Sequence, residues 1–93
     1  MLGNFRNEID LTNMNKTVAK CAAKAYVAQF QYFGIEYMGE CWSGLGGNLT
    51  YNKFGPSSQC VGGLGGDDSL FVYRFNEPRK LTMKCCFFGV GWG

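Results

Sequence analysis

Four carboxylates are the residues of this chain best suited to acid–base chemistry. Glu36 and Glu40 are close in sequence, and Asp67 and Asp68 are adjacent. Two carboxyl groups flanking a glycosidic bond are the machinery of glycoside hydrolysis, so counting alone leaves such a site open. However, hydrolysis also needs a deep cleft that distorts the sugar, and 93 residues offer little volume for one. We therefore expect no enzyme activity and no catalytic residue.

The chain contains no histidine, which excludes Ser-His and Cys-His nucleophile pairs and histidine-ligated metal sites. The glycine-rich segments 44–49 and 62–67 miss the GxGxxG spacing and the GK[ST] ending of phosphate-binding loops. Asp67 and Asp68 lack the alternating oxygen ligands of a calcium loop, so we interpret them as a solvated turn. We expect neither a metal nor a cofactor.

Charge and hydropathy exclude two classes of partner. The net charge is +2 with no long run of either sign, whereas nucleic-acid binding needs a concentrated basic face. No stretch approaches the roughly 18–20 consecutive apolar residues that a membrane span requires. We expect neither a nucleic-acid partner nor a membrane span.

The five cysteines, without any CxxC pair, indicate disulfides and an oxidising compartment. We expect Cys21 to pair with Cys41, and Cys60 to pair with Cys85 or Cys86, which point to opposite faces of one strand. The remaining thiol is then either buried and inert or available for an intermolecular bridge. Two glycosylation sequons, at Asn15 and Asn48, agree with a secretory route.

Aromatic residues interleaved with polar ones are the feature most suggestive of function. Sugars pack their C–H faces on aromatic rings, while their hydroxyls need fixed hydrogen-bonding groups. We expect Phe33, Phe71 and Trp42 to lie largely in the core, and Tyr32 and Tyr73, with Tyr51, to be exposed. The candidate carbohydrate-binding residues are Tyr32, Glu40, Trp42, Tyr51, Asn52, Asp67, Asp68 and Tyr73.

These residues must be positioned by one helix and several strands. Apolar residues at 18, 21, 25 and 28 predict an amphipathic helix over 17–30, with Thr17 or Asn15 as its N-cap. Alternating patterns predict strands over 31–38, 69–75 and 80–88, the last two forming a hairpin, and a short strand or turn at 40–44. Segment 44–68 holds more than half of the 14 glycines and is predicted to be loop throughout.

These elements predict an α+β domain over residues 1–93, with one helix packed on a small antiparallel sheet, a long Gly-rich loop and disulfide staples. Residues 1–16 are predicted to be an extended segment with one short strand at most. The opening MLGNFRNEIDL is not a signal peptide, because charges interrupt any apolar region, and we interpret Met1 as the edge of a mature chain or excised module.

Four segments together resemble a WSC domain of the divergent animal extracellular form: KCAAKA at 20–25, YFGIEYMGECWSG at 32–44, SSQCVGGLGG at 57–66 and FVYRF at 71–75. The match covers roughly residues 2–75. The resemblance implies a helix packed on an antiparallel sheet, in shape related to PAN/apple domains, and an extracellular, carbohydrate-binding role. The chain departs from the family at Asn4 and at Ala25 or Ser43, where the family carries cysteines, and at Cys85 and Cys86, beyond its last strand.

The function expected from the sequence is a secreted module that binds polysaccharide or glycoprotein glycan and serves targeting, adhesion or matrix attachment. The alternative is a secreted structural or protein-interaction module that forms homo-oligomers through its aromatic tail (Phe87, Phe88 and Trp92) or through the spare cysteine. A third interpretation, a defence or toxin peptide, lacks a strongly cationic amphipathic face.

Overall fold

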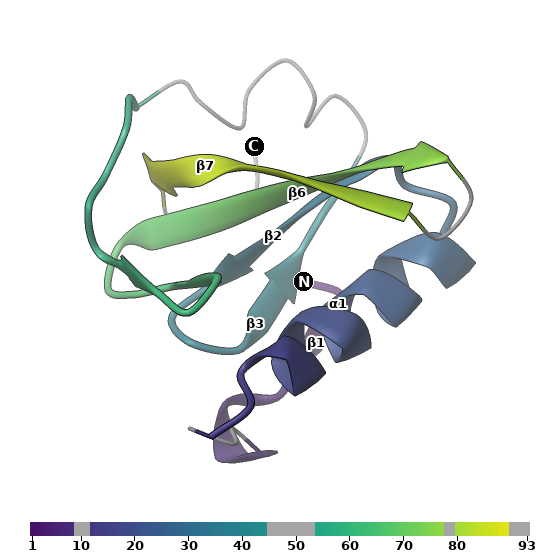
Figure 1. Cartoon of the computed structure of the whole chain (residues 1–93), viewed down its shortest axis with the longest axis horizontal. Helices are drawn as coiled ribbons and strands as arrows, with labels where there is room; N and C mark the ends of the chain where they lie inside the picture. Colours follow the sequence, from purple (N-terminus) through teal and green to yellow (C-terminus); the bar gives the residue numbers. More distant parts are fainter. Residues whose placement is uncertain (9–11, 45–53, 78–79, 90–93) are drawn as a thin grey trace.

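A computed structural model of the chain describes residues 1–8, 12–44, 54–77 and 80–89; for Glu77 and residues 83–85 it describes the backbone only. One helix, α1, packs on one face of a five-stranded antiparallel sheet with the strand order β1-β3-β2-β6-β7 (Figure 1). A second, two-stranded sheet pairs β4 with β5. The expected α+β fold is confirmed. The bounds are β1 Gly3–Asn4, the 3-10 helix η1 Arg6–Glu8, α1 Asn15–Val27, β2 Tyr32–Glu36, β3 Glu40–Trp42, β4 Cys60–Val61, β5 Leu64–Gly65, β6 Ser69–Glu77 and β7 Lys80–Phe88.

Helix α1 forms because small and apolar residues recur at helical spacing. Thr17, Val18, Cys21 and Ala25 are buried, and the predicted fourth member of the stripe, Ala28, is exposed. The helix begins two residues earlier than predicted, and the predicted cap is wrong. The N-cap residue is Met14, and no side-chain hydrogen bond caps the helix.

The helix ends three residues before the predicted boundary, because the chain turns left-handed at Gln29 (φ 64°). The N–H of Gln29 donates to Tyr26 O, and the N–H of Phe30 donates to Ala25 O. These two bonds form a Schellman motif, which satisfies the last carbonyls of the helix. Glycine usually fills the left-handed position, so glutamine gave no sequence signal for this end.

Strand β2 is shorter than the predicted 31–38 because Tyr37 and Met38 form the centre of a tight turn into β3, in which three residues separate the paired Glu36 and Glu40. Both residues have positive φ, 49° and 66°, as a type I′ hairpin turn requires. Gly39 follows, and a Cβ at this position would lie 2.7 Å from the backbone N of Arg6. Only glycine therefore lets the N-terminal segment pass this close to the turn.

The predicted hairpin is confirmed as β6 and β7, which pair antiparallel along almost their whole length, with a register shift between Val72 and Tyr73. The prediction that 44–68 is loop throughout is wrong. Cys60 and Val61 pair with Gly65 and Leu64 to form a small ladder. Leu64 is fully buried, and a Cβ on Gly65 would meet the carbonyl oxygen of Ser69 at 2.1 Å, so β5 packs tightly against the main sheet.

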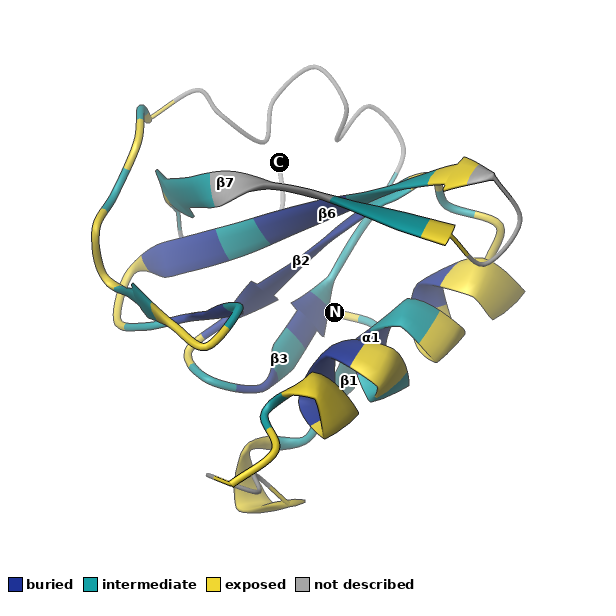
Figure 2. Ribbon diagram, in the orientation of Figure 1, coloured by how far each residue is buried: buried dark blue, intermediate teal, exposed yellow. Residues whose placement is uncertain are grey.

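The main cluster of the core lies between the sheet and α1, while Leu70 and Val72 are buried on the opposite face of the sheet. Phe33 and Ile35 of β2 and Tyr73 of β6 pack in the main cluster with Val18 and Leu64, and Figure 2 shows the buried residues gathered on the sheet and on the inner side of the helix. Two disulfides join the elements around this core. Cys21–Cys41 links α1 to β3, and Cys60–Cys86 links β4 to β7.

Candidate functional site

Strand register sorts the aromatic residues onto the two faces of the sheet. Gly34 pairs with Trp42 and Glu36 pairs with Glu40, so these side chains share one face, together with Tyr32 two residues along β2. Phe33 and Cys41 alternate with them and face the helix. The candidate residues Tyr32, Glu40 and Trp42 therefore lie together on the sheet face opposite α1.

The indole of Trp42 is oriented by the neighbouring carboxylate. Its Nε1–H donates to Glu40 Oε1 at 3.3 Å, and both side chains are half-buried. Trp42 lies opposite Gly34, which has no side chain to compete for the space beside the ring. An oriented ring beside a carboxylate provides a stacking surface and a hydrogen-bond acceptor in one place.

Tyr32 lies at the end of the same patch. It is half-buried, and Ser43 Oγ donates to its carbonyl oxygen, which fixes the end of β3 beside the start of β2. Its partner on β6 is Arg74, whose guanidinium donates from Nε and Nη2 to Asn76 Oδ1 at 3.0 and 2.6 Å. Arg74 was not predicted to be part of this face, although the alternation in FVYRF places its side chain on the face opposite to that of Tyr73.

The expectation that Tyr73 is exposed is wrong. Only 5% of it is accessible, and its ring stacks on Phe33 with centroids 5.3 Å apart, on the helix side of the sheet. Its hydroxyl donates to Gly63 O at 2.7 Å. Burial raises the pKa of Tyr73 to about 12. The helix and the β4–β5 hairpin cover this face, which is why a strand tyrosine with a polar tip is buried here.

Asp67 and Asp68 are exposed in a turn before β6, as predicted, but they are not near Tyr32. Because Tyr32 pairs with Arg74, six residues beyond Asp68, about 20 Å of strand separates the two sites. Glu36 lies opposite Glu40 and is 5% exposed. No cluster of metal-ligating side chains occurs among the described residues.

Some of the remaining candidate residues lie outside the described residues, and the exposure of the others is known. Tyr51, Asn52, the sequon Asn48 and Trp92 lie outside the described residues, whereas Asn15 is exposed at the first position of α1. Phe87 is half-buried and Phe88 is 45% exposed. A second exposed aromatic, Tyr37, lies at the β2–β3 turn with the Arg6 guanidinium 3.8 Å from its ring centroid.

Comparison with protein-family models, with curated proteins and with solved structures found no match. No helix in the described part of the chain is long and apolar enough to cross a membrane. Two disulfides in 93 residues are typical of proteins that fold in an oxidising environment.

Proposed function

We propose that the protein is an extracellular module that binds glycan through the sheet face opposite α1. The observation that carries the proposal is the patch of Tyr32, Glu40 and Trp42, in which a hydrogen bond orients a half-buried indole beside a carboxylate. The resemblance of 32–44 to the corresponding segment of WSC domains supports the same assignment, because both aromatic members and the carboxylate fall inside that segment.

In this proposal, the face of a sugar ring packs on the Trp42 indole, and Glu40 accepts a hydrogen bond from a sugar hydroxyl. Arg74, across from Tyr32, supplies donors at the neighbouring position. A shallow surface of this kind binds several units of an extended chain weakly, which suits targeting, adhesion or matrix attachment. Homo-oligomerisation would increase the avidity of such weak sites.

A glycan array followed by titration calorimetry of the oxidised protein tests the proposal. Trp42→Ala is expected to abolish detectable binding, and Trp42→Phe to retain part of it, because the packing of a sugar ring needs an aromatic face. Tyr26→Ala is the matched control, because Tyr26 is an exposed aromatic on the helix, away from the patch. The proposal fails if no glycan binds at millimolar site concentration, or if Trp42→Ala and Tyr26→Ala bind equally well.

A further inference from the structure

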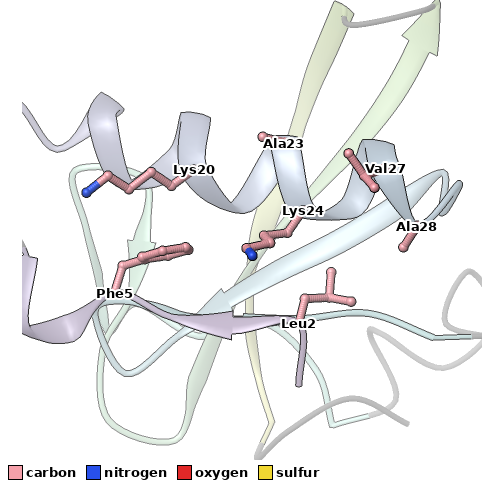
Figure 3. Close-up of a pocket in the computed structure, with 7 residues that line it drawn as sticks. All are labelled: Leu2, Phe5, Lys20, Ala23, Lys24, Val27 and Ala28. Atoms are coloured by element: carbon pink, nitrogen blue, oxygen red, sulfur yellow. The ribbon is translucent and has the colours of Figure 1, made fainter.

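A groove runs between α1 and the N-terminal strand β1, on the other side of the molecule's core from the glycan patch. Its volume is about 580 Å³, within the range of small-molecule sites. The wall is mostly apolar and carries two ammonium groups, being lined by Leu2, Phe5, Lys20, Ala23, Lys24, Val27 and Ala28. Figure 3 shows the Lys24 side chain running between the helix and β1, between Phe5 and Leu2.

The charge of this groove is unbalanced. Helix α1 contains three lysines and no acidic residue. Lys20 forms an ion pair with Glu8 at 3.0 Å and lies 5.4 Å from the centroid of the Phe5 ring. Lys24 is exposed and has no ion pair with any residue that the structure describes. Among the residues that the structure describes, the Lys24 ammonium of the groove is therefore a cation without a paired carboxylate, in an apolar setting.

The apolar part of the groove is open to a ligand. Val27 is 82% exposed, and Leu2 and Phe5 are only half-buried. Gly3 keeps the floor clear, because a Cβ there would lie 3.4 Å from the Phe5 ring and 3.8 Å from Lys24 Cε. Hydrocarbon placed along these residues would remove apolar surface of both partners from water.

We propose that this groove binds an amphipathic carboxylate, of which a medium-chain fatty acid is the simplest example. The carboxylate pairs with the Lys24 ammonium, and the chain lies along Leu2, Phe5 and Val27. A second copy of α1 is a poor occupant, because it would set lysines against lysines. A sulfated or uronic glycan is also a poor match, because the wall offers few partners for its hydroxyls.

Amide NMR of the full chain, titrated with octanoate below its micelle concentration, tests this site. Octanol tests the chain without the charge, and acetate tests the charge without the chain. We expect saturable shifts in α1 and β1 with octanoate, weaker binding of octanol and none of acetate. Equal affinity for octanoate and octanol, or shifts outside the groove, would overturn the proposal.

Two variants test the contribution of the Lys24 charge separately from that of the open space beside Gly3. Lys24→Met is expected to weaken octanoate binding about fivefold, which is the upper range for an exposed ion pair. Lys16→Met is the matched control, because Lys16 is on the same helix but does not line the groove. Gly3→Val keeps the charge and fills the floor, so it should weaken octanoate and octanol alike. Unchanged octanoate affinity in both Lys24→Met and Gly3→Val would contradict the site.

Three further experiments test the site without relying on the folding of a groove variant or on the glycan proposal. Added salt should weaken the binding of octanoate but not that of octanol. This experiment uses the wild-type chain and needs no variant. Binding to vesicles containing anionic phospholipid without any octanoate binding would show a lipid surface to be the ligand and would overturn the proposal. Trp42→Ala should leave octanoate binding unchanged, so failure at one site says nothing about the other.

Discussion

At the scale of single residues, neighbouring positions on one strand take opposite roles. Tyr32 and Phe33 are adjacent, yet Phe33 is fully buried under the helix and Tyr32 is half-buried on the opposite face. Tyr73 and Arg74 divide in the same way on β6. Whether an aromatic residue of these strands is buried therefore depends on which face of the sheet its position points to. The presence of a hydroxyl group on the ring does not determine its burial.

Tyr73→Phe isolates the hydrogen bond of the buried hydroxyl. The ring stays packed on Phe33, while Gly63 O loses its donor. We expect the free energy of unfolding to fall by about 1 kcal/mol. Urea denaturation of the oxidised variant and wild type measures the difference. A change below a few tenths of a kcal/mol would show that water satisfies both groups equally well.

The raised pKa of Tyr73 also predicts a pH dependence. Its folded-state pKa of about 12 exceeds the ordinary tyrosine value of 10.0, so the fold favours the neutral phenol. The contribution to stability is therefore complete below pH 10 and is lost as the pH rises towards 12. Absorbance titration of tyrosinate should show one group ionising later than the rest. That late component should be missing from Tyr73→Phe; its persistence would assign it to another tyrosine.

At the scale of elements, strands with strong alternation were predictable, and ends set by unusual backbone conformations were not. Residues 80–88 were predicted as a strand and form β7, because polar and apolar residues alternate over 80–84 and aromatic residues follow at 87 and 88. The end of α1 depends on left-handed Gln29, and the β4–β5 ladder depends on tertiary packing of Leu64. Neither has a local signal in the sequence.

The candidate site was predicted in part for the same reason. Tyr32, Glu40 and Trp42 are brought together because a tight turn over 37–39 pairs β2 with β3, and the sequence pattern had predicted two neighbouring elements there. Tyr73 was placed on the wrong face, because nothing in the sequence says which face of β6 the helix covers. Asp67 and Asp68 are distant from Tyr32 because the antiparallel direction of β6 puts them at the other end of β2, where Glu36 pairs with Leu70.

The Cys21–Cys41 disulfide should be a principal support of the helix. It closes a separation of 20 residues and joins α1 to β3 inside the core. The double variant Cys21→Ala/Cys41→Ala is expected to lose about 3 kcal/mol of unfolding free energy. Circular dichroism during denaturation measures this, with the Cys60–Cys86 bond intact as confirmed by mass spectrometry. Unchanged stability would mean that helix packing alone holds α1 on the sheet.

Close backbone approach should make Gly65 far more sensitive than Gly89. A Cβ at Gly65 would lie 2.1 Å from Ser69 O and 2.4 Å from Ile35 O, both backbone atoms that cannot move aside easily. At Gly89 a Cβ meets nothing within 4 Å. Gly65→Ala should therefore lower the unfolding free energy by about 2 kcal/mol or more, and Gly89→Ala by less than about 0.5. Similar melting temperatures for the two variants would contradict the packing of β5.

At the scale of the whole molecule, the two faces of the sheet differ in what covers them, although the face opposite α1 also carries the buried Leu70 and Val72. One face is covered by α1 and the β4–β5 hairpin and is locked by two disulfides, so it supplies stability. The other carries Tyr32, Glu40 and Trp42 and is the face proposed for glycan. The two disulfides, Cys21–Cys41 and Cys60–Cys86, use four of the five cysteines, and the side chain of the fifth, Cys85, lies outside the described residues.

Mapping the binding site of a glycan by NMR tests directly whether the sheet face that carries Trp42 binds carbohydrate. The measurement is amide and indole NMR of the oxidised chain, titrated with the oligosaccharide selected on the array. We expect saturable shifts of the NMR signals of the Trp42 indole and of the β2 and β3 amides, while the signals of α1 and of the residues around the buried Tyr73 stay unchanged. No shift with any oligosaccharide, or shifts confined to α1, would contradict this expectation.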